Sequence, residues 1–260
     1  MSSVHQGVDA WGRSERSRRT IRRLTAPAYR RWFRVELDGL EHLPASGGAL
    51  LVANHAGALP VDAALLMHGI ETATGRPVYG LHHWMLRELP FVGTFLARNG
   101  GVVANPANAQ RLLADEGQLV VVFPEGTKGT TKPYSQRYQL QRLGRGGFIE
   151  VAMRAGVPVL PVAITGTEET MPAVFSIDAG PGVRIPITAN AVVFGPAGAF
   201  VPWPAKIRAH ILAPIEPDVP AGMDTYNRRT VADWADLVRT RLQDELDHRT
   251  RTARPSPVGS

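Results

Sequence analysis

The chain has 260 residues, of which 20% are charged and none is cysteine, and its formal net charge is +6. This length allows one domain with a large buried core. The lack of cysteine excludes disulfides, thiolate metal sites and a cysteine nucleophile. No stretch reaches the roughly 18 apolar residues of a membrane-spanning helix, and the arginine-rich beginning lacks the apolar core of a signal peptide. We therefore expect a cytoplasmic protein.

Positive charge is concentrated in residues 13–34, which contain nine arginines and a single acidic residue. Aromatic and aliphatic side chains are interleaved with the arginines, as in helices that lie in a lipid interface. We expect residues 1–10 to be disordered and 11–34 to form a basic amphipathic helical segment, broken or kinked at Pro27, that faces an anionic membrane. A solvated basic face explains the pattern equally well, and nucleic acid is another partner that such a block can attract.

Apolar periodicity in the rest of the chain predicts strands that alternate with helices. The predicted strands are 35–40, 48–53, 77–81, 101–104, 118–123, 157–164, 190–194 and 207–212. The predicted helices are 61–74, 85–97 with an interruption around Pro90 and Gly93, 106–115, 147–154 and 226–249. This alternation indicates one α/β domain over 35–249, with a mostly parallel mixed sheet flanked by helices, and a flexible tail over 250–260.

A polar pair, Asn54-His55, interrupts the apolar pattern where the strand 48–53 ends, and Asp62 follows at the start of the next helix. Loops at the carboxyl ends of strands hold the chemistry of α/β folds. A neutral imidazole can accept a proton near pH 7, and a carboxylate can orient it. On one continuous helix a seven-residue offset would separate the two side chains by about 10.5 Å. Gly57 and Pro60 instead predict a loop that folds back and allows the contact.

A second polar turn, Phe123-Pro124-Glu125-Gly126-Thr127-Lys128-Gly129, follows the most apolar predicted strand. The backbone N–H groups of Gly126 and Thr127, with the charge of Lys128, are suited to a phosphate or a developing oxyanion. The polar stretch 129–145 predicts a loop over this site. The esterase elbow, the P-loop, the dinucleotide-binding glycines and the HExxH zinc motif are all absent from the sequence.

The two turns occur together with two further blocks, Val35–Glu41 and Gly156-Val157-Pro158-Val159-Leu160-Pro161-Val162. Four such blocks in this order resemble the glycerolipid O-acyltransferase superfamily, typified by lysophosphatidate (1-acylglycerol-3-phosphate) acyltransferase. The resemblance covers roughly residues 30–215. It implies a glycerol-phosphate acyltransferase-like fold, with 35–249 as the acyltransferase domain. It also implies transfer of a fatty acyl group from acyl-CoA or acyl carrier protein to a hydroxyl of a (lyso)phospholipid or other glycerolipid.

The resemblance also implies roles for individual residues. His55 would be the general base and Asp62 would orient it. No metal or bound cofactor is expected; the partners are an acyl thioester, a lipid acceptor and an anionic membrane surface, with the protein peripheral on the inner face of the cell membrane and no nucleic acid bound. A structural role for Glu125, bonded to N–H groups of its own turn, is nearly as good an interpretation. The expected substrate-binding residues are Asn54, Glu125, Gly126, Thr127 and Lys128.

Two departures from the family pattern leave alternatives open. Six residues separate His55 from Asp62, where the family has four, so a catalytically inactive lipid-binding relative is one alternative. The family also has a phosphate-contacting arginine between the two turns, where this chain has Val102-Val103-Ala104-Asn105-Pro106. An acyltransferase acting on a neutral acceptor, such as diacylglycerol or a glycolipid, is therefore the other alternative.

Overall fold

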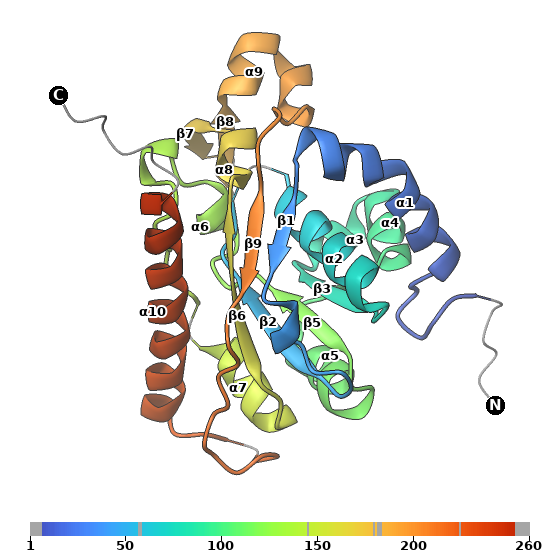
Figure 1. The fold of residues 1–260 in the computed structure, drawn as a ribbon, viewed down its shortest axis with the longest axis vertical. Coiled ribbons are helices and arrows are strands. Elements are labelled where there is room, and N and C mark those ends of the chain that lie inside the picture. Colours follow the sequence, from blue (N-terminus) through green and yellow to red (C-terminus); the bar gives the residue numbers. More distant parts are fainter. Residues whose placement is uncertain are drawn as a thin grey trace.

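The computed structural model describes residues 7–56, 59–144, 146–178, 180, 184–223 and 225–252. Within these residues, seven strands form a sheet in the order β1-β9-β6-β2-β5-β3-β4 (Figure 1). Strand β9 is antiparallel to β6 and parallel to β1, and the other neighbours are parallel. The prediction of a mostly parallel mixed sheet is confirmed. The strands are β1 (Glu36–Asp38), β2 (Ala49–Ala53), β3 (Val78–His82), β4 (Gly101–Val103), β5 (Leu119–Val122), β6 (Val159–Thr165) and β9 (Arg208–Ile211).

Helices cover both faces of this sheet (Figure 1). One face packs against the π-helix η1 (Ala28–Trp32) and α2 (Val61–Thr74). The other packs against α5 (Pro106–Gln110), the π-helix η3 (Arg111–Asp115), α7 (Gly147–Ala155) and α10 (Arg228–Thr252). Strand β2 lies in the middle and is buried on both faces, which explains why its sequence is a continuous apolar run rather than an alternating one. The shorter helical elements are η2 (Leu40–His42), α3 (Met85–Glu88), α4 (Val92–Arg98), α6 (Thr127–Thr130), η4 (Tyr134–Gln136), α8 (Thr167–Thr170), α9 (Ala189–Phe194) and η5 (Pro196–Phe200).

The region 170–204 differs from the sequence prediction. Residues 190–194 are not a strand; they belong to helix α9, and an unpredicted hairpin, β7 (Ala173–Asp178) with β8 (Arg184–Thr188), precedes it. Thr188 caps the helix by accepting a hydrogen bond from the Ala191 N–H. The buried Asn190 amide donates to the carbonyls of Thr170 and Val201. These local and tertiary bonds override the strand propensity of the Val-Val-Phe run.

The N-terminal segment is ordered earlier than predicted. Residues 1–6 lie outside the described residues, but Val8 forms a β-bridge with Ser14, and the Tyr79 hydroxyl donates to Asp9 at 2.6 Å. Helix α1 (Glu15–Pro27) continues past Pro27 into η1 without a break. The predicted tail is shorter than expected, because α10 extends to Thr252; the remaining residues, 253–260, lie outside the described part of the chain.

Part of the basic face of α1 is turned inward. Arg18 is buried and donates through Nε to the Glu71 carboxylate of α2 at 2.9 Å. Arg13 is also buried and reaches the other oxygen of Glu71 at 3.3 Å. These two arginines therefore attach the N-terminal segment to the domain, because a buried carboxylate requires paired charge. Across the described ranges, no helix is both long and apolar enough to cross a bilayer.

Candidate active site

The two predicted turns meet at one edge of the sheet. Strands β2 and β5 are parallel neighbours, with Val52 opposite Val122. The segments that follow them, which carry His55 and Glu125, therefore leave the sheet side by side. This is the position at which open α/β sheets place their ligands.

His55 and Asp62 form the contact that their spacing left open. The imidazole Nδ1 lies 2.7 Å from Asp62 Oδ2, and the same oxygen accepts a hydrogen bond from the Ala56 N–H at 3.0 Å. The other oxygen accepts from the Ala63 N–H at 2.7 Å in the first turn of α2. A carboxylate at a helix N-terminus is stabilised by the helix dipole. The contact that the sequence allowed is therefore made, and Pro60 directly precedes the helix. The predicted loop includes Gly57 and Ala58, which lie outside the described residues.

The imidazole is held with one nitrogen available. The centre of its ring lies 4.6 Å from the centre of the Phe123 ring, and its side chain is 16% exposed. Because Nδ1 faces Asp62, the proton-accepting position is Nε2. Burial lowers the pKa of His55, but the charge and hydrogen bond of Asp62, aided by the charge of Glu125, outweigh burial and hold this pKa above its usual value.

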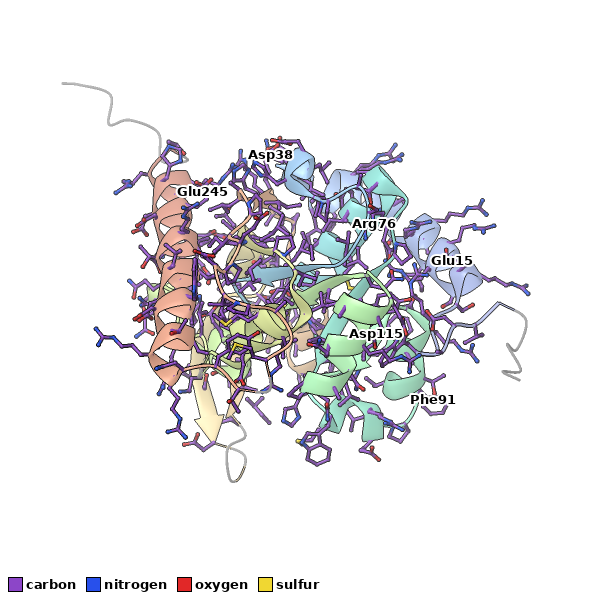
Figure 2. The ribbon with its side chains drawn as sticks, turned by 90° about the horizontal axis from the view of Figure 1, so that it is seen from below. Glu15, Asp38, Arg76, Phe91, Asp115 and Glu245 are labelled. Carbon is purple, nitrogen blue, oxygen red and sulfur yellow. The ribbon has the colours of Figure 1, made fainter. Side chains whose placement is uncertain are left out.

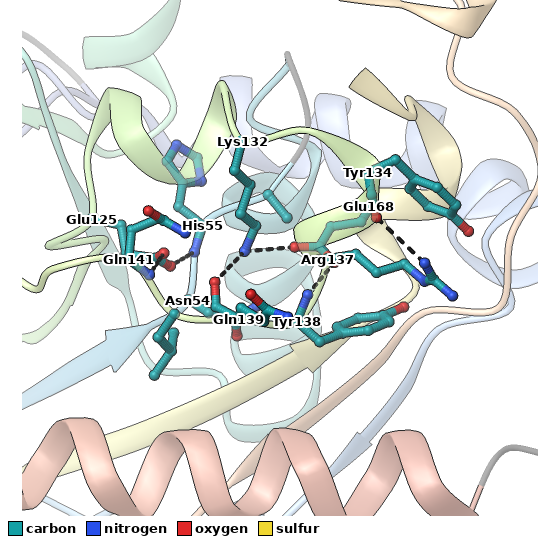
Figure 3. Close-up of polar contacts among 12 residues, drawn as sticks. Asn54, His55, Glu125, Lys132, Tyr134, Arg137, Tyr138, Gln139, Gln141 and Glu168 are labelled. Atoms are coloured by element: carbon teal, nitrogen blue, oxygen red, sulfur yellow. Dashed lines mark hydrogen bonds and ion pairs between the residues drawn. The ribbon is translucent and has the colours of Figure 1, made fainter. Parts of the chain in front are cut away.

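Glu125 holds the backbone around His55. Its Oε1 accepts the His55 N–H at 2.9 Å and its Oε2 accepts the Gln141 N–H at 2.7 Å (Figure 3). The side chain is 4% exposed, so both oxygens are occupied and turned away from solvent. The geometry supports the structural interpretation of Glu125 rather than acceptor binding, although the N–H groups belong to other segments and not to its own turn.

Asn54 is likewise part of the framework. Its amide nitrogen donates to the Ile164 carbonyl at 2.9 Å, and its amide oxygen accepts the Ile164 N–H at 2.7 Å. This pair extends the contact between β2 and β6 beyond the end of β2. A buried side chain that is bonded in this way fixes the start of the His55 segment. Its contact with substrate stays a prediction.

Gly126, Thr127 and Lys128 of the second turn differ in whether they have a donor group available for a ligand. The Gly126 N–H is used by the turn itself, since it donates to the Phe123 carbonyl at 3.0 Å. Thr127 begins α6, where the first N–H groups have no partner inside the helix. Lys128 is exposed on the same helix. Helix α6 packs very closely on the base, because a Cβ at Gly129 would lie 2.7 Å from the His55 carbonyl oxygen.

An ion pair that the sequence did not reveal lies next to this site. Lys132 is buried and bonds to Glu168 Oε1 at 2.7 Å and to the Gln139 carbonyl at 3.2 Å (Figure 3). The Tyr138 N–H donates to the other Glu168 oxygen at 2.7 Å. The positive charge of Lys132 opposes protonation of His55. No local pattern marks a pair whose members are 36 positions apart in the chain, so only the fold reveals it.

A hollow of about 600 Å³ lies beside the dyad rather than at it. It lies between the end of β6 and the end of α10, and its wall includes the loop residues Tyr138 and Gln139. Its basic lining side chains are Arg137, Lys206, Arg208 and Arg249. His55 does not line it, so we assign the chemistry from the geometry of the dyad and not from the size of the hollow.

The fold and the dyad together define an α/β protein with a histidine–aspartate pair at the carboxyl edge of its sheet. A sequence profile of the family described as Acyltransferase matches residues 34–165, which is half of the chain. The crystal structure of the 1-acyl-sn-glycerophosphate (LPA) acyltransferase PlsC from Thermotoga maritima shares the fold, with a TM-score of 0.58 and 22% identity over 88% of this chain and 78% of that chain.

The chain is also similar to curated proteins, of which one is uncharacterized and one is a named acyltransferase. An uncharacterized protein of Mycobacterium leprae is 39% identical over 224 residues, which covers 84% of this chain and 60% of that protein. A 1-acyl-sn-glycerol-3-phosphate acyltransferase of Chlamydomonas reinhardtii is 30% identical over 159 residues, which covers 57% of this chain and 42% of that enzyme. The chain thus spans about three fifths of the mycobacterial relative's length. The chain belongs to the Acyltransferase family, as its motifs predicted.

Proposed function

We propose that this protein is an O-acyltransferase that moves a fatty acyl group from a thioester to a hydroxyl of a glycerolipid. The observation that carries the proposal is the 2.7 Å contact between His55 Nδ1 and Asp62, in a ring whose Nε2 bonds to no other described residue. Family membership supports the class of reaction. The intact dyad argues against an inactive lipid-binding relative, because a broken dyad was the reason to consider one.

The reaction follows from the position of the base. The acceptor hydroxyl gives its proton to His55 Nε2 while its oxygen attacks the thioester carbonyl, forming a tetrahedral intermediate. The intermediate collapses by expelling the thiolate, which takes the proton back from the imidazolium. Asp62 stabilises the imidazolium between these steps, and such base catalysis contributes about 10²–10⁴-fold. The Thr127 N–H and the Lys128 ammonium, both on α6, would stabilise the negative charge that develops on the carbonyl oxygen.

The donor is acyl-CoA or an acyl carrier protein, and the acceptor is a lysophospholipid such as lysophosphatidate. The Chlamydomonas relative supports a phosphorylated acceptor by its name. Lys128 is exposed and precedes Gly129, the residue of α6 that contacts the His55 backbone, and we assign the phosphate to it. No metal or bound cofactor takes part in the proposed chemistry. We place the protein on the inner face of the cell membrane, where such lipids occur.

A neutral acceptor is the second candidate, and a specific observation favours it. After β4 the chain continues as Ala104-Asn105-Pro106, and the Asn105 side chain caps α5 by accepting the Ala107 N–H at 2.8 Å. The arginine of the family pattern is therefore missing here. Lys128→Ala distinguishes the candidates: it should raise the KM for lysophosphatidate by roughly tenfold or more, as expected for one charge-assisted hydrogen bond. The KM for diacylglycerol should not change.

The proposal is tested by His55→Ala, with consumption of the thioester and formation of acylated lipid both followed by mass spectrometry. Turnover should fall at least about 10²-fold while the unfolding transition stays in place. His248→Ala is the matched control, because it removes the same side chain at an exposed position of α10. A folded His55→Ala protein that keeps more than a tenth of the activity would refute the assignment of the base.

A further inference from the structure

Among the described residues, exposed large apolar side chains gather on a projection that we call the apolar knob. It consists of β7, β8, α9, η5 and Val201, and it stands at the upper end of the molecule in Figure 1. Soluble proteins rarely expose contiguous apolar patches of this kind without a partner. The exposed large apolar side chains of the knob are Val174, Phe175, Ile177, Ile185, Val192, Val193, Phe194, Phe200 and Val201.

The knob is a built element and not a loose loop. The sequence from 173 to 202 contains only two charged residues, Asp178 and Arg184. Inside it, the fully buried Asn190 bonds to the carbonyls of Thr170 and Val201 at 3.0 and 2.8 Å. These bonds keep Phe194 and Phe200 in solvent, at 62% and 73% exposure. A fixed arrangement of exposed phenylalanines indicates a surface made for an apolar environment.

The base of the knob is attached to the candidate active site. The Ser176 hydroxyl of β7 donates to the Thr131 carbonyl at 2.8 Å, and Thr131 directly follows α6. Helix α6 in turn packs on the His55 backbone at Gly129. Whatever the knob docks on is therefore brought next to the dyad.

The flank of the knob is positively charged. The Trp32 indole donates to the Pro202 carbonyl at 3.0 Å and so joins η1 to the knob. Arg30, Arg31 and Arg34 beside it are exposed, and none of them forms an ion pair with another described residue. Arginines near an anionic leaflet are attracted to it over about one Debye length. Apolar tips with a cationic flank complement a negatively charged bilayer.

We propose that the apolar knob inserts into the surface of an anionic bilayer and presents the His55 dyad to lipid acceptors there. The inference deepens the proposed function, on which it rests for the identity of the acceptor. Insertion of Phe194 and Phe200 supplies the salt-insensitive part of binding, and Arg30, Arg31 and Arg34 supply the salt-sensitive part.

The test is co-sedimentation of the full chain with vesicles of equimolar phosphatidylcholine and phosphatidylglycerol, without substrates. Phe194→Asp and Phe200→Asp should each weaken binding roughly tenfold. Met223→Asp is the matched control, because it makes the same change at an exposed apolar residue in the loop before α10. Phe91→Asp is a second control, which replaces a 90% exposed side chain between α3 and α4 (Figure 2). Loss of binding in Phe91→Asp but not in the knob variants would overturn the proposal.

A direct readout of insertion is available because the chain has no cysteine. Phe194→Cys, labelled with a polarity-sensitive fluorophore, should shift to shorter wavelength when vesicles are added, and labelled Met223→Cys should not. An unshifted Phe194 label overturns the proposal even if both Asp variants unfold. So does a lipid-free dimer, detected by sedimentation, that Phe194→Asp abolishes while vesicle binding persists. Binding does not require turnover, so a failure of the proposed acyl transfer would leave these results unaffected.

Discussion

Replacement of Glu125 by glutamine separates the two roles that its sequence position allowed. The carboxylate accepts two backbone N–H groups, from His55 and Gln141, and is almost fully buried. A glutamine has the same shape but only one acceptor oxygen, so its NH₂ group must face one of these N–H donors. The substitution therefore removes one charge-assisted hydrogen bond and leaves a buried donor without an acceptor.

The size of the effect follows from that geometry. A hydrogen bond to a charged group contributes about 1.5–3 kcal/mol, so we expect the free energy of unfolding to fall by about 2–3 kcal/mol. Displacement of the His55 backbone should also lower kcat, because a shift of about 1 Å in a catalytic group costs on the order of 10²-fold. The acceptor KM should stay nearly constant, since both Glu125 oxygens are bonded to backbone N–H groups and buried.

Urea unfolding and steady-state kinetics with varied acceptor measure these quantities. The kinetics should be run at alkaline pH, because removal of the Glu125 charge also lowers the pKa of His55. Glu150→Gln is the control: that carboxylate is partly exposed in an ion pair with Arg154, and its loss should cost about 0.5 kcal/mol at most. A tenfold higher acceptor KM, with kcat and unfolding unchanged, would show that Glu125 binds the acceptor and that our reasoning is wrong.

Two further predictions concern the groups around the imidazole. The base must be neutral, so wild-type activity should be lost as the pH falls through the raised pKa of His55. In Asp62→Asn, burial still lowers this pKa, but the carboxylate charge that raises it is gone. The acid limb of kcat/KM should therefore move to lower pH, and the plateau should drop about 10²–10⁴-fold. An acid limb that stays in place would contradict this. Gly129→Ala should destabilise the fold by about 1–3 kcal/mol and slow turnover, because its Cβ would lie 2.7 Å from the His55 carbonyl oxygen. Gly147→Ala, which meets no atom within 4 Å, should have little effect in the same measurements.

The sheet could be predicted from the sequence because its central strands are buried on both faces. Strands β2, β5 and β6 are continuous apolar runs in the sequence, and each is bounded by turn residues. The inner face of α10 was also predictable, because Val231, Val238, Leu242 and Leu246 recur at helical spacing and are buried. In these elements, burial alone determines the residue pattern.

The rest depended on contacts between distant residues. The partners of Asn54 and Glu125 could not be predicted, because Ile164 and Gln141 contribute backbone groups that any residue would provide. Arg13, before α1, and Arg18, on α1, were predicted to face a membrane, because nothing in their own pattern indicates the buried Glu71 on α2. A sequence pattern indicates that a segment is buried. It does not indicate which polar group of another segment will contact it.

The spacing of the dyad shows which structural constraint allows His55 and Asp62 to meet. Two extra residues between His55 and Asp62 do not separate the side chains, because Nδ1 and Oδ2 still lie 2.7 Å apart. The bonds that fix the carboxylate are made by residues adjacent to the dyad: Ala56 donates to one oxygen and Ala63 to the other. Both donors are chain neighbours of the dyad residues, so the contact rests on local geometry at the two ends of the intervening segment. The constraint on the motif is therefore the position of Asp62 in the first turn of α2, and not the number of residues that precede it.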